Sequence, residues 1–350
     1  MATFTVTNLN DSGAGSLREA ITNANAAAGP DTVQFQVGLT GTLVLTSGQL
    51  VIADDLTING DNTGDNKADI TISGNLESRV FMVSDFAAYT HLNSLTLTEG
   101  LASYGGAIFA AKGTSLYVSH TTVSGSYATL GGGIATEGAL FLDTSTVSDN
   151  YAFQGGGGIF VESGGGANIY NSTIDGNFSR GIGGGVLVGI GTGGAAGLTL
   201  ISSTVTDNTA IGGGGGIAFG KDSYLRAENT VIALNTAVIN PTVHEWSPGQ
   251  GQIAAENSFL GTAVSIDVDD GGNFNGGGDP LLGKLQDNGG TVWTRNIDDG
   301  SPLINAGGTT VLANDANGDS RVSFGKMDIG ATEFSGPLVV TTASDIVADD

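Results

Sequence analysis

Cysteine is absent from the 350 residues, and only three histidines and six prolines are present. The lack of cysteine excludes disulfide bonds, thiolate catalysis and cysteine-bound zinc. His91, His120 and His244 are too scattered in the sequence to indicate a zinc site or a histidine-based triad. Because proline is scarce and glycine follows no three-residue period, the chain is not collagen-like.

Basic residues are also scarce. Eleven Lys and Arg stand against 35 Asp and Glu, which gives a formal net charge of -24. A field of this sign repels nucleic acids and anionic membrane surfaces, so we predict no nucleic-acid partner. The same charge fits a protein of a calcium-containing exterior, since carboxylate and carbonyl oxygens are the ligands of hard cations.

Targeting signals and helical patterns are missing as well. The N-terminus, MATFTVTNLNDSGAG, shows no basic region followed by an apolar run, so no cleavable signal peptide is visible. An uncharged stretch between Arg180 and Asp207 is broken by Gly, Ser and Thr and alternates with a period of two, so we predict no membrane span. Between residues 30 and 335 there is no convincing helical period, which argues against helical repeat folds.

Glycine is the residue in excess, at 59, and it is concentrated in an internal repeat. Four copies read TVSGSYATLGGGI (122–134), TVSDNYAFQGGGGI (146–159), TIDGNFSRGIGGGV (173–186) and TVTDNTAIGGGGGI (204–217). A weaker fifth copy, TVIALNTAV, begins at Thr230. The spacing between copies is about 25 to 31 residues, which is typical of a solenoid.

Each period holds three short β-like runs, for example GIFVES, ANIYNS and STIDGN, separated by Gly, Asn or Asp. This pattern predicts an all-β fold: a right-handed parallel β-helix with three-strand coils of about 25–31 residues, each paired with the next. In such a stack Asn150, Asn177, Asn208 and Asn235 would superpose as a ladder of hydrogen-bonded amides.

The residues that follow each ladder position also have a structural interpretation. Tyr127, Tyr151 and Phe178 would stack as an aromatic stripe. The glycines would form corners where φ is positive or where a side chain has no room. The cluster at 155–158 lacks the Lys-Ser/Thr of a phosphate-binding loop, so we assign it no nucleotide.

The N-terminal segment GSLREAITNANAAAGPD predicts a short amphipathic helix over 16–28 that caps the β-helix. Ser16 and Glu19 have the spacing of a capping box. The apolar side chains that would cover the first coil are Leu17, Ala20, Ile21 and Ala24.

Both ends of the chain resemble a known family. TVTNLNDSGAGSLREAITNANAAAGPDTVQF resembles the CSLREA segment of secreted bacterial β-helix proteins, here without its cysteine. DPLLGKLQDNGGTVWTRNIDDGSPLINAG (279–307) and MDIGATEF (327–334) resemble their choice-of-anchor Q segment, and the central repeats are similar to those of polymorphic outer-membrane adhesins. The resemblance implies a secreted or surface-displayed scaffold with adhesive or carbohydrate-binding roles, and it supplies no catalytic residue.

We therefore expect one capped β-helix domain over 1–336. Its most regular coils would lie at 90–240 and its C-terminal segment at 257–335. LVVTTASDIVADD (338–350) echoes the start of the chain, which indicates that residues 337–350 begin a following repeat unit or linker.

Calcium is the cofactor that two acidic loops suggest. Asp315, Asn317 and Asp319 have the alternate spacing of an oxygen-ligand loop, and Asp328 could complete it, although the sixth and twelfth positions depart from an EF-hand. The second loop, 267–279, alternates Asp and Asn. A solvated turn is the alternative interpretation of both loops.

An enzymatic hypothesis rests on charged residues of the repeats. Asp149, Asp175 and Asp207 lie near one predicted corner and could supply the two carboxylates of a glycoside hydrolase. A polysaccharide lyase would need a cation, for which Arg180 is the candidate. The competing interpretation is that the aspartates form turns beside the ladder, which their repetition at equivalent positions favours.

Ligand contact is expected where the repeat is interrupted, at NPTVHEWSPGQGQ (240–252), which carries Glu245 and Trp246. Tyr151 and Phe178 could serve as sugar platforms. Together these features favour a non-catalytic extracellular or cell-surface module, structural or adhesive, with glycans, other cells or its own copies as partners. The alternatives are a polysaccharide lyase or glycoside hydrolase and, third, a self-assembling filament or surface-layer subunit.

Overall fold

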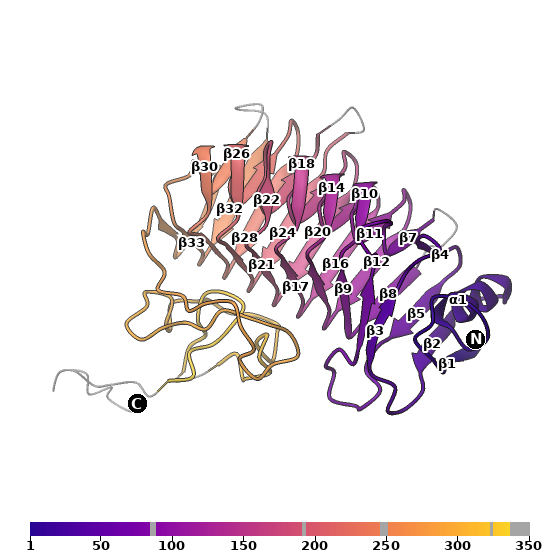
Figure 1. Ribbon diagram of the computed structural model, residues 1–350. Helices are drawn as coiled ribbons and strands as arrows, with labels where there is room; N and C mark the ends of the chain where they lie inside the picture. Colours follow the sequence, from indigo (N-terminus) through magenta and orange to yellow (C-terminus); the bar gives the residue numbers. More distant parts are fainter. Residues whose placement is uncertain (85–88, 191–193, 246–250, 323–324, 337–350) are drawn as a thin grey trace.

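The computed structural model describes residues 1–84, 89–190, 194–245, 251–322 and 325–336. Within these ranges the chain winds as a rod of stacked coils, and strands of neighbouring coils pair in parallel to form four sheets (Figure 1). This architecture confirms the predicted all-β parallel β-helix.

The four sheets run along the rod. The eleven-stranded sheet contains β1 (Thr3–Val6), β2 (Asp31–Phe35), β5 (Leu56–Asn59), β8 (Tyr89–Asn93), β12 (Ser115–Ser119), β16 (Ala139–Asp143), β20 (Gly166–Tyr170), β24 (Gly197–Ile201), β28 (Tyr224–Glu228), β32 (Gln252–Glu256) and β34 (Val268–Gly271). The ten-stranded sheet contains β3 (Gly41–Val44), β6 (Ile70–Ser73), β9 (Leu95–Thr98), β13 (Thr122–Ser124), β17 (Thr146–Ser148), β21 (Thr173–Asp175), β25 (Thr204–Thr206), β29 (Val231–Ala233), β33 (Phe259–Leu260) and β35 (Phe274–Asn275). The eight-stranded sheet contains β4 (Leu50–Ile52), β7 (Phe81–Val83), β11 (Ile108–Ala110), β15 (Ile134–Thr136), β19 (Ile159–Val161), β23 (Val186–Val188), β27 (Ile217–Phe219) and β31 (Val243–Glu245). The six-stranded sheet contains β10 (Leu101–Tyr104), β14 (Tyr127–Leu130), β18 (Tyr151–Gly155), β22 (Phe178–Ser179), β26 (Thr209–Gly213) and β30 (Thr236–Ile239).

The core forms because apolar and polar residues alternate along each strand, which turns one row of side chains to the interior. Val147, Ile174 and Val205 are register partners in three successive coils and are fully buried. Burying a side chain of this size contributes about 1.5–3 kcal/mol relative to leaving it exposed. Columns of such residues, repeated on each face, hold the rod together.

The six-stranded sheet corrects the prediction of three strands per coil. Between Leu101 and Ile239 each coil carries a fourth short strand, which begins directly after the ladder position, as Tyr151 follows Asn150. The chain projects outward there before it turns into the eight-stranded sheet (Figure 1). Pairing with the neighbouring projections satisfies backbone groups that an isolated loop would leave without partners.

The asparagine ladder is confirmed. The Nδ2 atoms of Asn150, Asn177 and Asn208 each donate to the Oδ1 atom of the next asparagine, at 3.0, 2.9 and 3.0 Å, and Asn235 ends the ladder. The backbone amide of each also donates to the same Oδ1 atom in the next coil. A buried side chain with this many partners fixes the bend at which it lies.

The glycine clusters are corners, as predicted. Gly156 has φ 64°, a left-handed conformation that favours glycine. At Gly157 a Cβ atom would lie 2.2 Å from the carbonyl oxygen of Gly184 in the next coil, so no side chain fits. The clusters are therefore required by the close approach of neighbouring coils.

The N-terminal cap is helix α1 (Leu17–Ala26). The Ser16 hydroxyl accepts a hydrogen bond from the backbone amide of Glu19 at 3.2 Å, and the Glu19 carboxylate accepts from the amide of Gly15 at 2.6 Å. The four apolar side chains predicted to cover the first coil are all buried, namely Leu17, Ala20, Ile21 and Ala24. Across the described ranges, no helix has the length and apolar character needed to cross a membrane.

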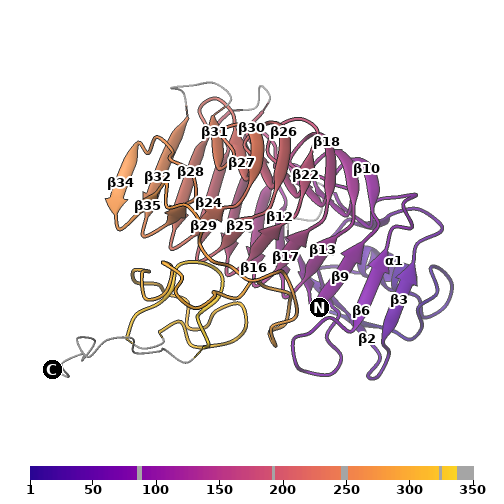
Figure 2. The same ribbon diagram turned by 60° about the vertical axis from the view of Figure 1, so that its left-hand side comes forward.

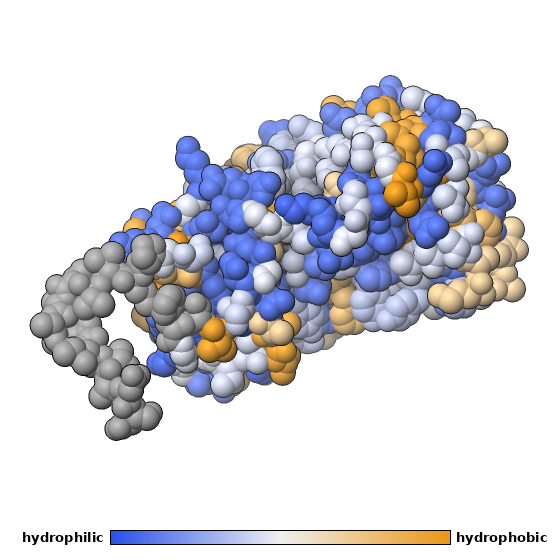
Figure 3. Space-filling model, turned by 90° about the horizontal axis from the view of Figure 1, so that it is seen from below, coloured by the Kyte–Doolittle hydropathy of each residue, from blue (hydrophilic) through white to orange (hydrophobic). Residues whose placement is uncertain are grey.

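The coils continue to Asn275, further than predicted, and residues 279–336, here called the C-terminal segment, fold back beneath the ten-stranded sheet (Figures 1 and 2). The segment packs Ile297, Leu303 and Ile329 against Val231 and Phe259 of the sheet. Its underside is mainly hydrophilic (Figure 3). It therefore covers the outer face of the later coils.

Candidate functional site

The aspartates of the enzymatic hypothesis lie at the ends of strands in the ten-stranded sheet. Asp149 and Asp207 occupy one structural position, with φ 54° and 52°, and Gly176 takes that position in the coil between them. Asp175 instead ends β21 and pairs with Ser148. The three aspartates were predicted at equivalent positions, and this is wrong for Asp175, which lies one residue before the position that Asp149 and Asp207 occupy.

Arg295 of the C-terminal segment binds two of these carboxylates. Its Nε atom donates to Asp175 Oδ2 at 2.5 Å, and its Nη2 atom donates to Asp207. Burial lowers the pKa of Arg295, but Asp175 and Asp207 outweigh this effect and raise it overall, so the guanidinium stays charged. Burial raises the pKa of the Asp175 carboxyl, and the adjoining Arg295 opposes that rise.

The cation beside these carboxylates is thus Arg295, and Arg180, the candidate cation for a lyase, forms none of the ion pairs with them. The Arg180 guanidinium lies 6.0 Å from the centroid of the Phe153 ring. Asp149 has no such ion pair within the described ranges, and burial raises the pKa of its carboxyl. In this arrangement Asp175 and Asp207 fasten the C-terminal segment to the rod.

The predicted aromatic stripe is present. The Tyr151 and Phe178 rings stack with centroids 5.4 Å apart and planes 16° apart, and Tyr127 lies 5.7 Å from Tyr151. Because Tyr151 and Phe178 turn their faces toward each other, they present mainly their edges outward. The stripe is therefore a stacked ladder, and it does not offer the open ring faces on which a sugar packs.

The six-stranded sheet exposes several large apolar side chains on both of its faces, since adjacent residues such as Val238 and Ile239 point to opposite sides of β30. Its exposed large side chains, here called the apolar ridge, range from 41% exposed at Tyr127 to 81% at Val238 and comprise Leu101, Tyr104, Tyr127, Phe153, Ile211, Val238 and Ile239. None of the six strands contains a charged residue. They form the upper edge of the molecule in Figure 1, at intervals of about 4.8 Å, the spacing of paired strands. Large apolar side chains exposed together over one sheet are typical of an interaction site.

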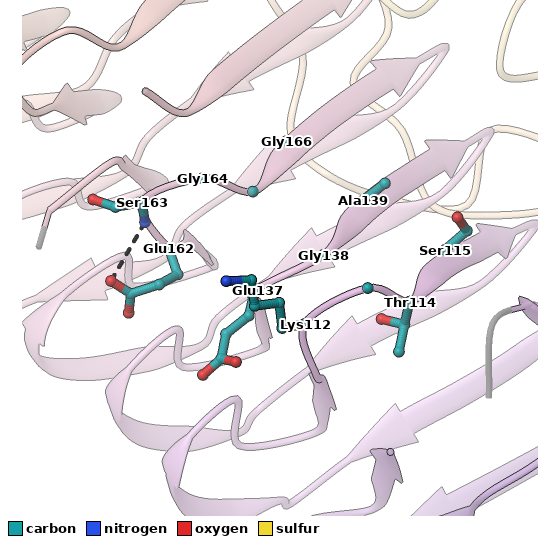
Figure 4. A pocket seen from close by; sticks show the side chains of 12 residues that line it. Lys112, Thr114, Ser115, Glu137, Gly138, Ala139, Glu162, Ser163, Gly164 and Gly166 are labelled. Atoms are coloured by element: carbon teal, nitrogen blue, oxygen red, sulfur yellow. Dashed lines mark hydrogen bonds between the residues drawn. The ribbon is translucent and has the colours of Figure 1, made fainter. Parts of the chain in front are cut away.

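A hollow of about 710 Å³ lies where the eight-stranded sheet turns into the eleven-stranded sheet (Figure 4). Two residues, Glu137 and Gly138, join β15 to β16, whereas four residues form the turn on each side, 111–114 and 162–165. The short turn leaves a saddle between two longer ones. Lys112, Glu137 and Glu162 extend from the three successive turns (Figure 4).

The two glutamates of the saddle are neighbours in register. They follow Thr136 and Val161, which are paired, so their backbones lie about 4.8 Å apart. Burial raises the pKa of the Glu162 carboxyl; a hydrogen bond from the Ser163 amide opposes the rise, and the charge of Glu137 adds to it. Sequence analysis missed this pair, although glutamate stands here where other coils have Ala111, Gly189 or Gly220.

The acidic loop of the calcium hypothesis has other partners. Asp315 accepts hydrogen bonds from the backbone amides of Asn317, Asp319 and Glu333, and Asp328 accepts from two further amides. Burial raises the pKa of both Asp315 and Asp328. In the 267–279 loop, the first aspartate accepts from the backbone amide at position 253. The described residues contain no group of three or more His, Cys, Asp or Glu that could hold a metal, and calcium stays a prediction.

Sequence analysis did not foresee the buried ion pair beside this loop. Arg321, 1% exposed, donates to Glu333 Oε1 at 3.1 Å, to the Ser202 carbonyl at 3.2 Å and to Asn171. The last two residues belong to turns of the coils, so Arg321 joins the C-terminal segment to the rod. Burial and the neighbouring Asp328 raise the pKa of Glu333 to about 8, with Arg321 opposing.

Trp246 of the predicted ligand loop lies outside the described residues, as do residues 337–350 and their proposed repeat unit. Glu245 is the last residue of β31, and its side chain is not among the described parts of the structure.

Comparison with known proteins bears on the fold. The crystal structure of pectate lyase Pel9A matches with a TM-score of 0.53 over 95% of this chain and 96% of that chain, at 15% sequence identity. The chain is a parallel β-helix. No family model matches the sequence, and neither does any curated protein. At 15% identity the likeness of this β-helix to the pectate lyase extends to the fold alone, and the resemblance of its end segments stays a prediction.

Proposed function

We propose that this β-helix is a non-catalytic adhesive module of a larger extracellular or cell-surface protein, and that it binds glycans through the apolar ridge. The observation that carries the proposal is the ridge itself: seven large apolar side chains exposed on one sheet whose strands contain no charged residue. The binding of Asp175 and Asp207 by Arg295 supports a non-catalytic function at that corner.

The chemistry of the ridge selects an uncharged partner surface. A formal charge of -24 disfavours close approach of a second copy and of anionic polymers. The C–H faces of sugar rings in a neutral polysaccharide can pack on aliphatic and aromatic side chains, and the tyrosine hydroxyls Tyr104 and Tyr127 can hydrogen-bond to sugar oxygens. Repetition along the rod allows several rings of one chain to bind together, which multiplies weak individual contacts.

The experiment measures retention of the protein on insoluble cellulose and chitin. Phe153→Ser combined with Ile211→Ser should weaken retention at least about tenfold, equivalent to about 1.4 kcal/mol. Val37→Ser is the matched control because Val37 is 84% exposed at the other end of the rod. Unchanged retention of the double variant would overturn the proposal, as would sedimentation showing that the ridge binds a second copy.

Cleavage of a polysaccharide at the saddle is a second candidate. The specific observation is the pair Glu137 and Glu162 on neighbouring turns, because burial and the charge of Glu137 raise the pKa of the Glu162 carboxyl. The two residues stand on adjacent coils whose backbones lie about 4.8 Å apart, and retaining glycoside hydrolysis uses an acid and a nucleophile whose carboxyls lie about 5–5.5 Å apart. Lys112 could neutralise an acidic sugar, as a lyase requires.

The test of this second candidate is product release from neutral and acidic polysaccharides. Reducing ends report hydrolysis, and ultraviolet absorbance of unsaturated products reports a lyase. Glu137→Gln or Glu162→Gln should abolish any turnover, while the exposed control Glu77→Gln should leave it unchanged. If no polysaccharide yields product with the unmodified protein, the saddle is not a cleavage site.

A further inference from the structure

A second, smaller hollow of about 390 Å³ lies on the outer face of the eleven-stranded sheet. Its walls come from β8, β12 and β16, from the turn at His120 and from the loop that joins β5 to β6. The side chains that give it chemical character are Asn66, His91, Asn93, Tyr117, Phe141 and Asp143. A volume of this size lies within the range of small-molecule sites.

The hydrogen bonds at the floor of this hollow fix the tautomer of His91. Ser119 Oγ donates to Asn93 Oδ1 at 2.7 Å, so the hydroxyl proton is already used. His91 Nε2, 2.7 Å from the same Ser119 Oγ, must therefore be the donor. Asn93 in turn donates to Asn59 at 2.9 Å. In neutral His91 the Nδ1 atom is consequently a hydrogen-bond acceptor with a fixed orientation.

Both histidines at the hollow stay neutral near pH 7. Burial lowers the pKa of His91 and of His120, and the charge of Asp143 only partly opposes this. His120 is held from the far side by Thr291 of the C-terminal segment, 2.9 Å from Nδ1. The C-terminal segment thus orders one wall of the hollow.

One wall is aromatic. Tyr117 stacks on Phe141 with centroids 4.5 Å apart, and Tyr89 stacks on the other side of Tyr117 at 4.6 Å. Tyr117 and Phe141 are register partners in adjacent strands, which brings their rings together. The hollow thus combines an apolar wall with fixed acceptors and donors, the combination by which proteins hold a small polar ring in one orientation.

We propose that this hollow binds a single neutral pyranose unit, with Asp143 and His91 accepting hydrogen bonds from sugar hydroxyls and the outward edges of the stacked Tyr117 and Phe141 rings lining the apolar wall. A metal ion is disfavoured because the described residues here form no group of three suitable ligands. An anion is disfavoured because Asp143 and the net charge of -24 repel it, while neutral histidines supply no compensating charge. The inference rests on the proposed glycan-binding function and names a second subsite for it.

The histidines make the test direct, since the chain has only three. Imidazole proton resonances are recorded while methyl glycosides of glucose, galactose, mannose and N-acetylglucosamine are added, with methyl galacturonoside as the anionic probe. We expect a saturating shift of the His91 and His120 signals with at least one neutral glycoside and none with the anionic probe. No shift with any neutral glycoside at its solubility limit would overturn the proposal.

Variants separate this subsite from the ridge. Asp143→Ala and His91→Ala should each weaken glycoside binding at least tenfold. Asn168→Ala, on the same sheet face but outside the hollow, should leave glycoside binding unchanged. Melting curves show whether each variant folds. If the variants bind as tightly as the parent, the subsite is wrong even where ridge-dependent retention on cellulose or chitin persists. If both glycoside binding and retention are absent, the glycan function itself fails.

Discussion

Replacing Glu333 by Gln should change how the stability of the protein depends on pH. The side chain is 2% exposed, and its two oxygens accept from Arg321 at 3.1 Å and from the backbone amide of Asp328 at 3.0 Å. Burial and the charge of Asp328 raise the pKa of Glu333 from 4.5 to about 8, although Arg321 opposes the rise. The folded protein therefore binds this proton more tightly than the unfolded chain.

The sign and size follow from this difference. The contribution to the free energy of unfolding is fully present below pH 4.5 and is lost progressively as the pH rises to about 8. At about 1.4 kcal/mol per pH unit, the total loss is on the order of 5 kcal/mol. The raised pKa values of Asp315 and Asp328 act with the same sign. Glu333→Gln removes one titrating group, so its stability should fall less over the same range.

The assay is urea-induced unfolding of the parent and of Glu333→Gln at several pH values between 4.5 and 8. We expect the parent to lose stability toward pH 8, and the difference between the two proteins to shift by several kcal/mol in favour of the variant. Glu77→Gln, an exposed substitution, controls for the change in net charge. If the two curves run parallel, or if the parent becomes more stable as the pH rises, the buried cluster does not titrate as described.

Three further outcomes follow from the same contacts. Arg295→Ala should lower the free energy of unfolding by about 3–5 kcal/mol because it leaves Asp175 buried without its cation. The control Arg226→Ala removes an exposed ion pair and should cost less than about 1 kcal/mol. Equal effects of the two variants in urea unfolding would contradict this prediction. Asn177→Ala should lower the free energy of unfolding by about 2–4 kcal/mol, because the backbone and side-chain N–H groups of Asn150 lose their acceptor. Calorimetry that shows no loss of stability would contradict a stabilising role for the ladder. If the acidic loops hold calcium as predicted, chelation should lower the melting temperature, and an unchanged melting temperature would contradict the calcium hypothesis.

The features that sequence predicts well here are those repeated at the coil spacing. The ladder of Asn150 and Asn177 and the burial of Val147 follow from the self-alignment of the chain, since stacked coils bring equivalent residues together. The helix from Leu17 follows from local signals, a capping box and an apolar face, which require no knowledge of distant contacts.

The features that escaped prediction join parts of the chain that share no period. Arg295 lies 120 residues from Asp175, and Arg321 lies 150 residues from Asn171. No local pattern indicates which face of the rod such a segment covers. The saddle was not predicted for another reason. It forms because the turn at Glu137 and Gly138 is two residues shorter than the equivalent turns of the neighbouring coils, and this difference in length appears only when the coils are aligned with one another.

The salt dependence of retention on insoluble polysaccharide tests the central claim, that the apolar ridge binds glycans, most directly. Apolar contact does not weaken as salt screens charges, whereas binding through the acidic surface would change strongly between about 0.1 and 1 M salt. We predict that the parent is retained on cellulose or chitin equally or more tightly at high salt, and that Phe153→Ser with Ile211→Ser loses retention at both concentrations. Retention that disappears at high salt, or that the double variant keeps, would contradict the claim.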